Sequence, residues 1–259
     1  MLHAHHGASP SLAPTLAMFF TAVVYLRDWL AHRSNRSNAI PVWRAGSFLA
    51  GLFLIWNAVG SPVATLDHEW LTAHMVQHLL LMTLGPPLLW LGAPAAARRW
   101  GALAQPAFCW LVAAVVLMAW HVPIVFTFGM QSAGWHAVER VSFLMAGLLF
   151  WLPVVQDESH GSTDARWSIV VYLFLATLPC DILSGFLVFS ERVAYPIYFS
   201  TSRHAIASVL ADQECAGAVM WTCVTIVYFA VGAILTTKWL AMPRGGASAL
   251  RRDPRALEA

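Results

Sequence analysis

Seven apolar stretches make up most of this chain, and they restrict it to folds that live in a membrane. Crossing a bilayer takes an α-helix of about 17–25 residues. The stretches lie near residues 11–30, 43–62, 70–92, 106–126, 135–155, 167–189 and 213–240. They are too long and too uniformly apolar for the alternating strands of an outer-membrane barrel. Only 11% of the residues are charged, against about 25% in a soluble domain. The sequence predicts an all-α integral membrane protein, a bundle of seven transmembrane helices.

The basic residues predict how this bundle is oriented, because cytoplasmic connections are enriched in Arg and Lys. Most of them lie in the connections after the first, third and fifth stretches and in the segment after the seventh. Only Arg192 and Arg203 fall on the other side, and Arg140 lies within a span. We therefore expect the N-terminus outside and the C-terminus in the cytoplasm. The expected parts are an external tail at 1–10 with His3, His5 and His6, a membrane domain at 11–242, and a basic cytoplasmic tail at 243–259.

Two histidines stand out within the third stretch. His74 and His78 are four residues apart, so on a helix both imidazoles lie on one face. Met82 shares that face, and Met75 adjoins it. Ionisable groups inside a membrane are costly and usually serve a function. Imidazole nitrogens and thioether sulfurs together favour a transition metal, and copper best.

Other polar side chains gather at the same depth. With the expected orientation, five spans bring ionisable or metal-binding residues to the outer leaflet, whereas the inner half has almost none. The residues are His74, His78, Met118, His121, His136, Glu139, Arg140, Cys180, Asp181, Asp212, Glu214 and Met220, with Asp67, His68 and Glu69 in the second connection. Scattered structural residues would show no such preference. The asymmetry predicts a site open to the external face.

Several of these residues also have simpler explanations. His136 can serve as a hydrogen-bond partner between helices, and His121 lies near the predicted end of its helix, where an exposed imidazole is unremarkable. Glu139 and Arg140 can neutralise each other. Asp212 can cap the seventh helix. Asp181 needs a partner within its span, and both Arg140 and a bound cation are candidates.

Several motifs together resemble one family, the CtaG-type cytochrome c oxidase assembly factors of bacteria. They run from the third stretch to the seventh, and their order makes the resemblance specific. The motifs are His74-Met75-Val76-Gln77-His78 with Pro86-Pro87, Trp120-His121-x-Pro123, His136-x-x-Glu139 with Phe150-Trp151-x-Pro153, Tyr195-Pro196-x-Tyr198, and Asp212-Gln213 with Gly217 and Met220-Trp221.

The resemblance implies a seven-span protein of the bacterial inner membrane that helps to mature haem–copper oxidases at the copper step. It implies a metallochaperone rather than an enzyme. Copper, preferably Cu(I), is expected on the residues that match: His74, His78, His121, Met75, Met220, Asp212 and His136. His136 is the weakest of these, because Arg140 stands where the family often has a second histidine. The expected partners are an oxidase subunit, membrane lipid and a periplasmic copper chaperone. A homo-oligomer is left open, and no nucleic acid is expected.

Two other functions fit the same residues. A haem b protein needs axial histidines on facing helices, which His78 could provide together with His121 or His136. A copper or proton transporter could use Asp181, Glu139 and Arg140 as a relay. The inner half of the predicted bundle offers almost no polar path, which disfavours the transporter.

Overall fold

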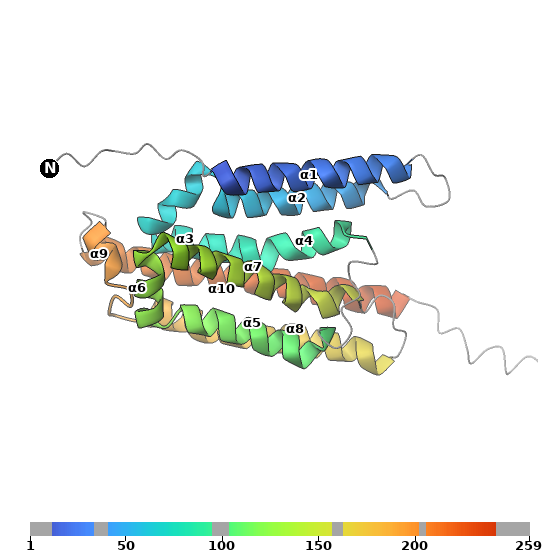
Figure 1. Ribbon diagram of the computed structural model, residues 1–259. Coiled ribbons are helices and arrows are strands. Elements are labelled where there is room, and N and C mark those ends of the chain that lie inside the picture. The colour runs from blue at the N-terminus through green and yellow to red at the C-terminus, as the bar shows by residue number, and fades with distance from the viewer. Residues whose placement is uncertain (1–11, 34–40, 95–103, 157–162, 202–205, 242–259) are drawn as a thin grey trace, which may run out of the picture.

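The computed structural model describes residues 12–33, 41–94, 104–156, 163–201 and 206–241, and every regular element in these ranges is a helix (Figure 1). The elements are α1 (Leu12–Arg33), α2 (Val42–Val59), η1 (Pro62–His68), α3 (Leu71–His78), η2 (Leu79–Leu84), α4 (Gly85–Gly92), α5 (Pro106–Trp120), α6 (Pro123–Gln131), α7 (Ala133–Gln156), α8 (Thr163–Phe189), α9 (Ile197–Thr201) and α10 (Ile206–Ala241). The predicted all-α fold is confirmed for these residues.

The described residues contain five or six candidate membrane-spanning helices, where the sequence predicts seven. Five helices of the described residues are long and apolar enough to cross a membrane: α2, α3 with η2 and α4, α7, α8 and α10. The bent pair α5 and α6 makes a sixth if it counts as one span. These helices indicate a multi-pass membrane protein. Helix α1 occupies the first predicted stretch without being among them, so the seventh span and the orientation stay predictions. The tails at 1–10 and 243–259 lie outside the described residues.

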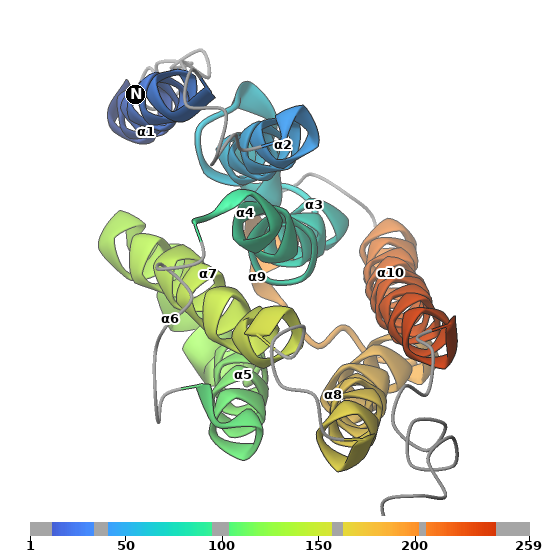
Figure 2. The ribbon, with the colours of Figure 1, turned by 90° about the vertical axis from the view of Figure 1, so that its right-hand side faces the viewer.

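The third span is the centre of the bundle. Seen from one end (Figure 2), α3 and α4 lie between α2, α7 and α10, and α1 lies at the edge beside α2. The short elements η1, α6 and α9 gather at one end of the long helices (Figure 1). We call this the capped end. Helix α3 reaches it, so His74 and His78 lie near it.

A π-helical turn interrupts the third span. Leu79–Leu84 forms η2, and α4 resumes at Gly85. At Gly85 a Cβ atom would lie 2.7 Å from the carbonyl oxygen of Leu80, so the wide turn needs a glycine there. Trp151 donates a hydrogen bond from Nε1 to the carbonyl of Met82 at 3.1 Å. π-Helical turns are rare and frequent near functional sites, and this one directly follows His78.

Helix α7 packs directly against that turn. At Gly147 of α7 a Cβ atom would lie 2.7 Å from Cα of Met82 and 2.8 Å from its oxygen. Only a residue without a side chain allows so close an approach of the two backbones. The contact fixes how α7 lies across the third span, and with it which α7 side chains face His74 and His78.

The fourth predicted span, 106–126, is not one straight helix. Helix α5 ends at Trp120, and α6 begins at Pro123 with a bend of 75°. Proline has no N–H to donate and clashes with the preceding turn, so it begins helices rather than continuing them. His121 lies at the bend and is 4% exposed. It is therefore buried, and the simpler explanation of an exposed interfacial histidine does not apply.

Candidate metal centre

Three buried side chains meet at the capped end, and we call them the buried triad: His74, His78 and Glu139. His74 and His78 project from one face of α3, as their spacing predicts. Glu139 comes from α7 and places Oε1 3.2 Å from Nε2 of His74 and 3.4 Å from Nε2 of His78. His74 and Glu139 are 0% and 1% exposed. The triad thus lies in the protein interior.

The atoms that meet in the buried triad have no hydrogen-bond partner among the described residues. This holds for Nε2 of both imidazoles and for both carboxylate oxygens of Glu139. Leaving a buried polar group unpaired costs about 1–3 kcal/mol, so four such atoms around one point call for an explanation. Donor atoms that hold one ion tetrahedrally at about 2.0–2.2 Å lie roughly 3.3–3.6 Å apart. The two measured separations are close to this spacing, and the donor set fits a transition ion.

A second group lies beside the first and reaches the surface. Asp67 and His68 end η1, and His136 comes from the first turn of α7. His136 Nε2 is 3.1 Å from Oδ2 of Asp67, and His68 Nε2 is 3.9 Å from Oδ1. Asp67 is fully buried, whereas the His68 side chain is 48% exposed. We call Asp67, His68 and His136 the surface triad.

Arg140 binds the surface triad through Asp67. Its Nη2 atom lies 2.6 Å from Oδ2 of Asp67. Burial raises the pKa of Asp67, but the adjacent His136 imidazole and the charge of Arg140 outweigh it and hold this pKa below its ordinary value. The partner of Arg140 is thus Asp67, not Glu139 or Asp181 as the sequence suggested. Because Asp67 neutralises the guanidinium, Arg140 does not leave an unpaired cation beside His136.

His121 and Met75 form a nitrogen–sulfur pair on the other side of the buried triad. His121 Nε2 lies 3.2 Å from Sδ of Met75, and Nδ1 lies 2.7 Å from the carbonyl oxygen of Leu117. That carbonyl can only accept, so it assigns the proton of a neutral imidazole to Nδ1. Nε2 then presents a lone pair toward the sulfur. Metal-binding histidines are commonly oriented by such a backbone carbonyl, and nitrogen with thioether suits Cu(I).

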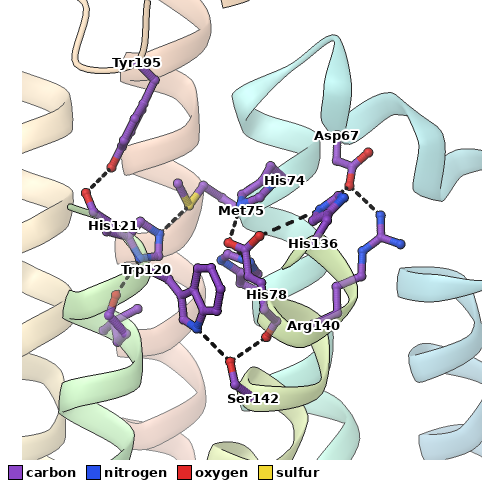
Figure 3. Close-up of polar contacts among 12 residues, drawn as sticks. Asp67, His74, Met75, His78, Trp120, His121, His136, Arg140, Ser142 and Tyr195 are labelled. Atoms are coloured by element: carbon purple, nitrogen blue, oxygen red, sulfur yellow. Dashed lines mark hydrogen bonds and ion pairs between the residues drawn. The ribbon is translucent and has the colours of Figure 1, made fainter. Parts of the chain in front are cut away.

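The five imidazoles form a row. Ring centroids are 5.1 Å apart for His68 and His136, 5.8 Å for His136 and His74, 4.4 Å for His74 and His78, and 5.5 Å for His78 and His121. Figure 3 shows His136, His74, His78 and His121 following one another, with Met75 next to His121. The row leads from a half-exposed side chain into the bundle interior.

Asp212 and Met220 lie in different surroundings. The Asp212 carboxylate accepts backbone hydrogen bonds from Leu71 at 2.6 Å and Thr72 at 3.3 Å, so it caps α3 rather than its own helix. Met220 is buried and lines a cavity of about 40 Å³ together with Met75 and His78. The structure therefore brings together five of the predicted ligands: His74, His78, His121, His136 and Met75. Met220 lies across a small cavity from them. Asp212 contacts backbone N–H groups instead.

Neighbouring side chains fix the segments that carry these residues. Gln213 accepts a hydrogen bond from the N–H of Ala194 at 2.7 Å and donates to the carbonyls of Leu187 and Arg192. The segment held in this way carries two tyrosines. Tyr195 donates to the carbonyl of His121 and Tyr198 to that of Asp67, both at 2.9 Å. These contacts tie both ends of the row to the rest of the capped end.

Comparison with known proteins decides the family. The family model of the cytochrome c oxidase caa3 assembly factor, Caa3_CtaG, matches residues 23–242. The chain belongs to this family.

Curated relatives carry no functional description. Uncharacterized proteins of Mycobacterium bovis and Mycobacterium tuberculosis are each 25% identical over 257 residues, which cover 88% of this chain and 38% of theirs. An uncharacterized protein of Mycobacterium leprae is 23% identical, covering 78% of this chain and 35% of its own. The chain thus spans well under half the length of these relatives. No solved structure matches it.

Three residues of the two triads, Glu139, Asp67 and His68, were not identified as candidate ligands from the sequence. Glu139 was read as a partner for Arg140, although it follows His136 by three residues and so shares its helix face. Asp67 and His68 were noted only as polar residues of a connection. The sequence does place Asp67 and His68 at about the same membrane depth as His136. Pairing them with His136 required knowing that η1 folds back over α7.

Proposed function

We propose that this chain is a membrane assembly factor for cytochrome c oxidase that binds copper at the buried triad and delivers it to the oxidase or assists its insertion. The observation that carries the proposal is the convergence of His74, His78 and Glu139 with unpaired donor atoms. Two imidazoles and a carboxylate are donors for a first-row transition ion. Family membership supplies the oxidase as the destination.

Copper is favoured over other ions by the pair next to the triad. His121 and Met75 offer a nitrogen and a thioether sulfur 3.2 Å apart, and thioethers select Cu(I). Met220 lies across the adjoining cavity as a further soft donor. A cuprous ion held by the triad thus has soft ligands within reach, which favours release by ligand exchange. No bond in a substrate is made or broken, so the role is binding and transfer rather than catalysis.

The proposed topology sets the direction of delivery. Seven spans with the N-terminus outside and the C-terminus in the cytoplasm would turn the capped end toward the outer face of the bacterial inner membrane. Copper would then come from that side, for which a periplasmic copper chaperone is the natural donor. The recipient would be an oxidase subunit whose copper centre is reached from the same side. Membrane lipid surrounds the helices, and a homo-oligomer is compatible with this arrangement.

The haem alternative has no specific observation in its favour. A haem between His78 and another histidine needs a flat slot at the Nε2 end of the imidazole. That end instead faces Oε1 of Glu139 at 3.4 Å. The cavity beside His78 measures about 40 Å³, room for little more than a water molecule. A Soret band in the purified protein would revive this alternative.

The test is copper binding by the purified full chain in detergent. The protein is loaded anaerobically with Cu(I), excess ion is removed, and the bound copper is measured. The wild type is expected to retain copper, and the His74→Ala/His78→Ala double variant to lose the copper of the buried triad. His32→Ala is the matched control, because His32 pairs with Asp28 in an exposed His–Asp contact on α1. A wild type that holds no copper, with the double variant behaving identically, would refute the proposal.

A further inference from the structure

The surface triad is a metal-binding arrangement in its own right. Its donor atoms, a carboxylate oxygen and two imidazole nitrogens, lie within 4.8 Å of one another. Oδ1 of Asp67 and Nε2 of His136 are buried and have no hydrogen-bond partner among the described residues. The buried triad described above uses none of these atoms. A further ligand role for them would explain why they stay unpaired.

Arg140 prepares Asp67 for such a role without blocking it. The guanidinium holds Oδ2 at 2.6 Å, and a carboxylate keeps a second oxygen for another partner. That oxygen, Oδ1, is the one nearest His68. The Tyr198 hydroxyl also donates a hydrogen bond to the backbone carbonyl of Asp67. The carboxylate is therefore fixed in place with one oxygen available toward the exposed imidazole.

His136 connects the two triads. Its Nε2 atom lies 3.1 Å from Asp67 Oδ2 and 3.9 Å from Glu139 Oε2. Its ring also stacks on His74 with an angle of 9° between the planes. An ion held by His136 in the surface triad therefore has a ligand of the buried triad as its immediate neighbour.

We propose that Asp67, His68 and His136 form a second copper site, which takes up the ion at the capped end and passes it to His74, His78 and Glu139. This inference rests on the proposed function for the identity of the ion. The transfer is a ligand exchange: the bonds to His68, Asp67 and finally His136 break as bonds to Glu139, His74 and His78 form. The ion keeps its oxidation state, and Arg140 stays on Oδ2 throughout.

Copper(II) is a suitable probe for both sites. The imidazole and carboxylate donors of each triad bind it, and its unpaired electron reports on neighbouring ions by electron paramagnetic resonance. The wild type in detergent is expected to bind two equivalents, with spectra broadened by coupling between the two ions. His68→Ala is expected to bind one equivalent without that broadening. The half-exposed side chain makes this a mild change for folding, and His68→Cys, which retains a ligand, is expected to restore two equivalents.

Two further variants separate the sites. The His74→Ala/His78→Ala double variant is expected to bind one equivalent, at the surface triad. His32→Ala is expected to bind two equivalents, like the wild type. In a stopped-flow experiment at limiting copper, His68→Ala is also expected to load the buried triad more slowly than the wild type does.

The outcomes distinguish this inference from the proposed function. A wild type that binds a single equivalent, kept by His68→Ala and lost in the double variant, would overturn the second site and leave the copper function intact. Loss of one equivalent in His68→Ala with an unchanged loading rate would overturn the transfer. A wild type that binds no copper would refute both proposals.

Discussion

The carboxylate of Asp212 accepts a hydrogen bond from the backbone N–H of Leu71 at 2.6 Å, and this contact joins α10 to the first turn of α3. The first N–H groups of a helix have no partner within it. An acidic residue there also interacts favourably with the helix dipole. A residue from a distant part of the chain thus caps the helix that carries His74 and His78.

Replacing Asp212 should lower stability before it affects copper. Asp212→Ala removes the cap, for which the expected loss is about 1–2 kcal/mol. Asp212→Asn keeps an acceptor oxygen and should lose less. Thermal unfolding in detergent measures the first effect and copper titration the second. Full stability with complete loss of copper in Asp212→Asn would instead indicate that Asp212 is a ligand.

Glu139→Gln should separate copper binding from folding. The amide has nearly the shape of the carboxylate but cannot supply its charge, so we expect the buried triad to lose its copper. Without metal, the variant should be as stable as the wild type or more stable, because a buried anion without hydrogen bonds is costly. Saturating copper at about 100 times its dissociation constant should stabilise only the wild-type triad, by about 2.7 kcal/mol. Equal copper-induced shifts in melting temperature for both proteins would contradict this account.

Gly147→Ala should disturb the site from a distance. The added methyl group would lie 2.7 Å from the backbone of Met82, and a helix backbone cannot move aside easily. We expect a loss of about 1–3 kcal/mol in stability and weaker copper binding, because α7 must shift and carries Glu139 with it. Gly185→Ala on α8 is the matched control, since nothing lies within 4 Å of the added atom. Equal effects of the two substitutions would refute the role of the close contact.

Arg140→Gln should destabilise the metal-free protein because it leaves the buried Asp67 carboxylate without its charged partner. The expected cost is about 1–3 kcal/mol. Copper in the surface triad would supply positive charge to the same carboxylate. Added copper should therefore raise the melting temperature of Arg140→Gln more than that of the wild type. The prediction fails if copper raises both melting temperatures equally.

The sequence predicted the helical fold and the shared helix face of His74 and His78, because both depend on local spacing. A spacing of four residues from His74 to His78 is enough to place both imidazoles on one face of a helix. Apolar length is likewise enough to identify most spans. Helix α1 shows the limit of that signal. It is long enough to span a membrane, but it is not among the helices that are also apolar enough to do so.

The rest of the site depends on contacts between distant segments. Glu139 faces the two histidines because α7 crosses the third span at Gly147, and no pattern within α7 encodes that crossing. Asp67 meets Arg140 only once η1 folds over α7. The cap that Asp212 provides joins residues 141 positions apart. His121 is the intermediate case. Pro123 predicts the bend from the sequence alone, but the burial of His121 follows from packing between helices.

X-ray absorption at the copper edge tests the buried triad most directly. Purified protein carrying one equivalent of Cu(I) should show nitrogen or oxygen ligands at about 2.0 Å, with the outer-shell scattering typical of two imidazoles. That imidazole scattering should disappear in the His74→Ala/His78→Ala variant. A wild-type spectrum without imidazole scattering, or one that the double substitution leaves unchanged, would contradict copper binding by His74, His78 and Glu139.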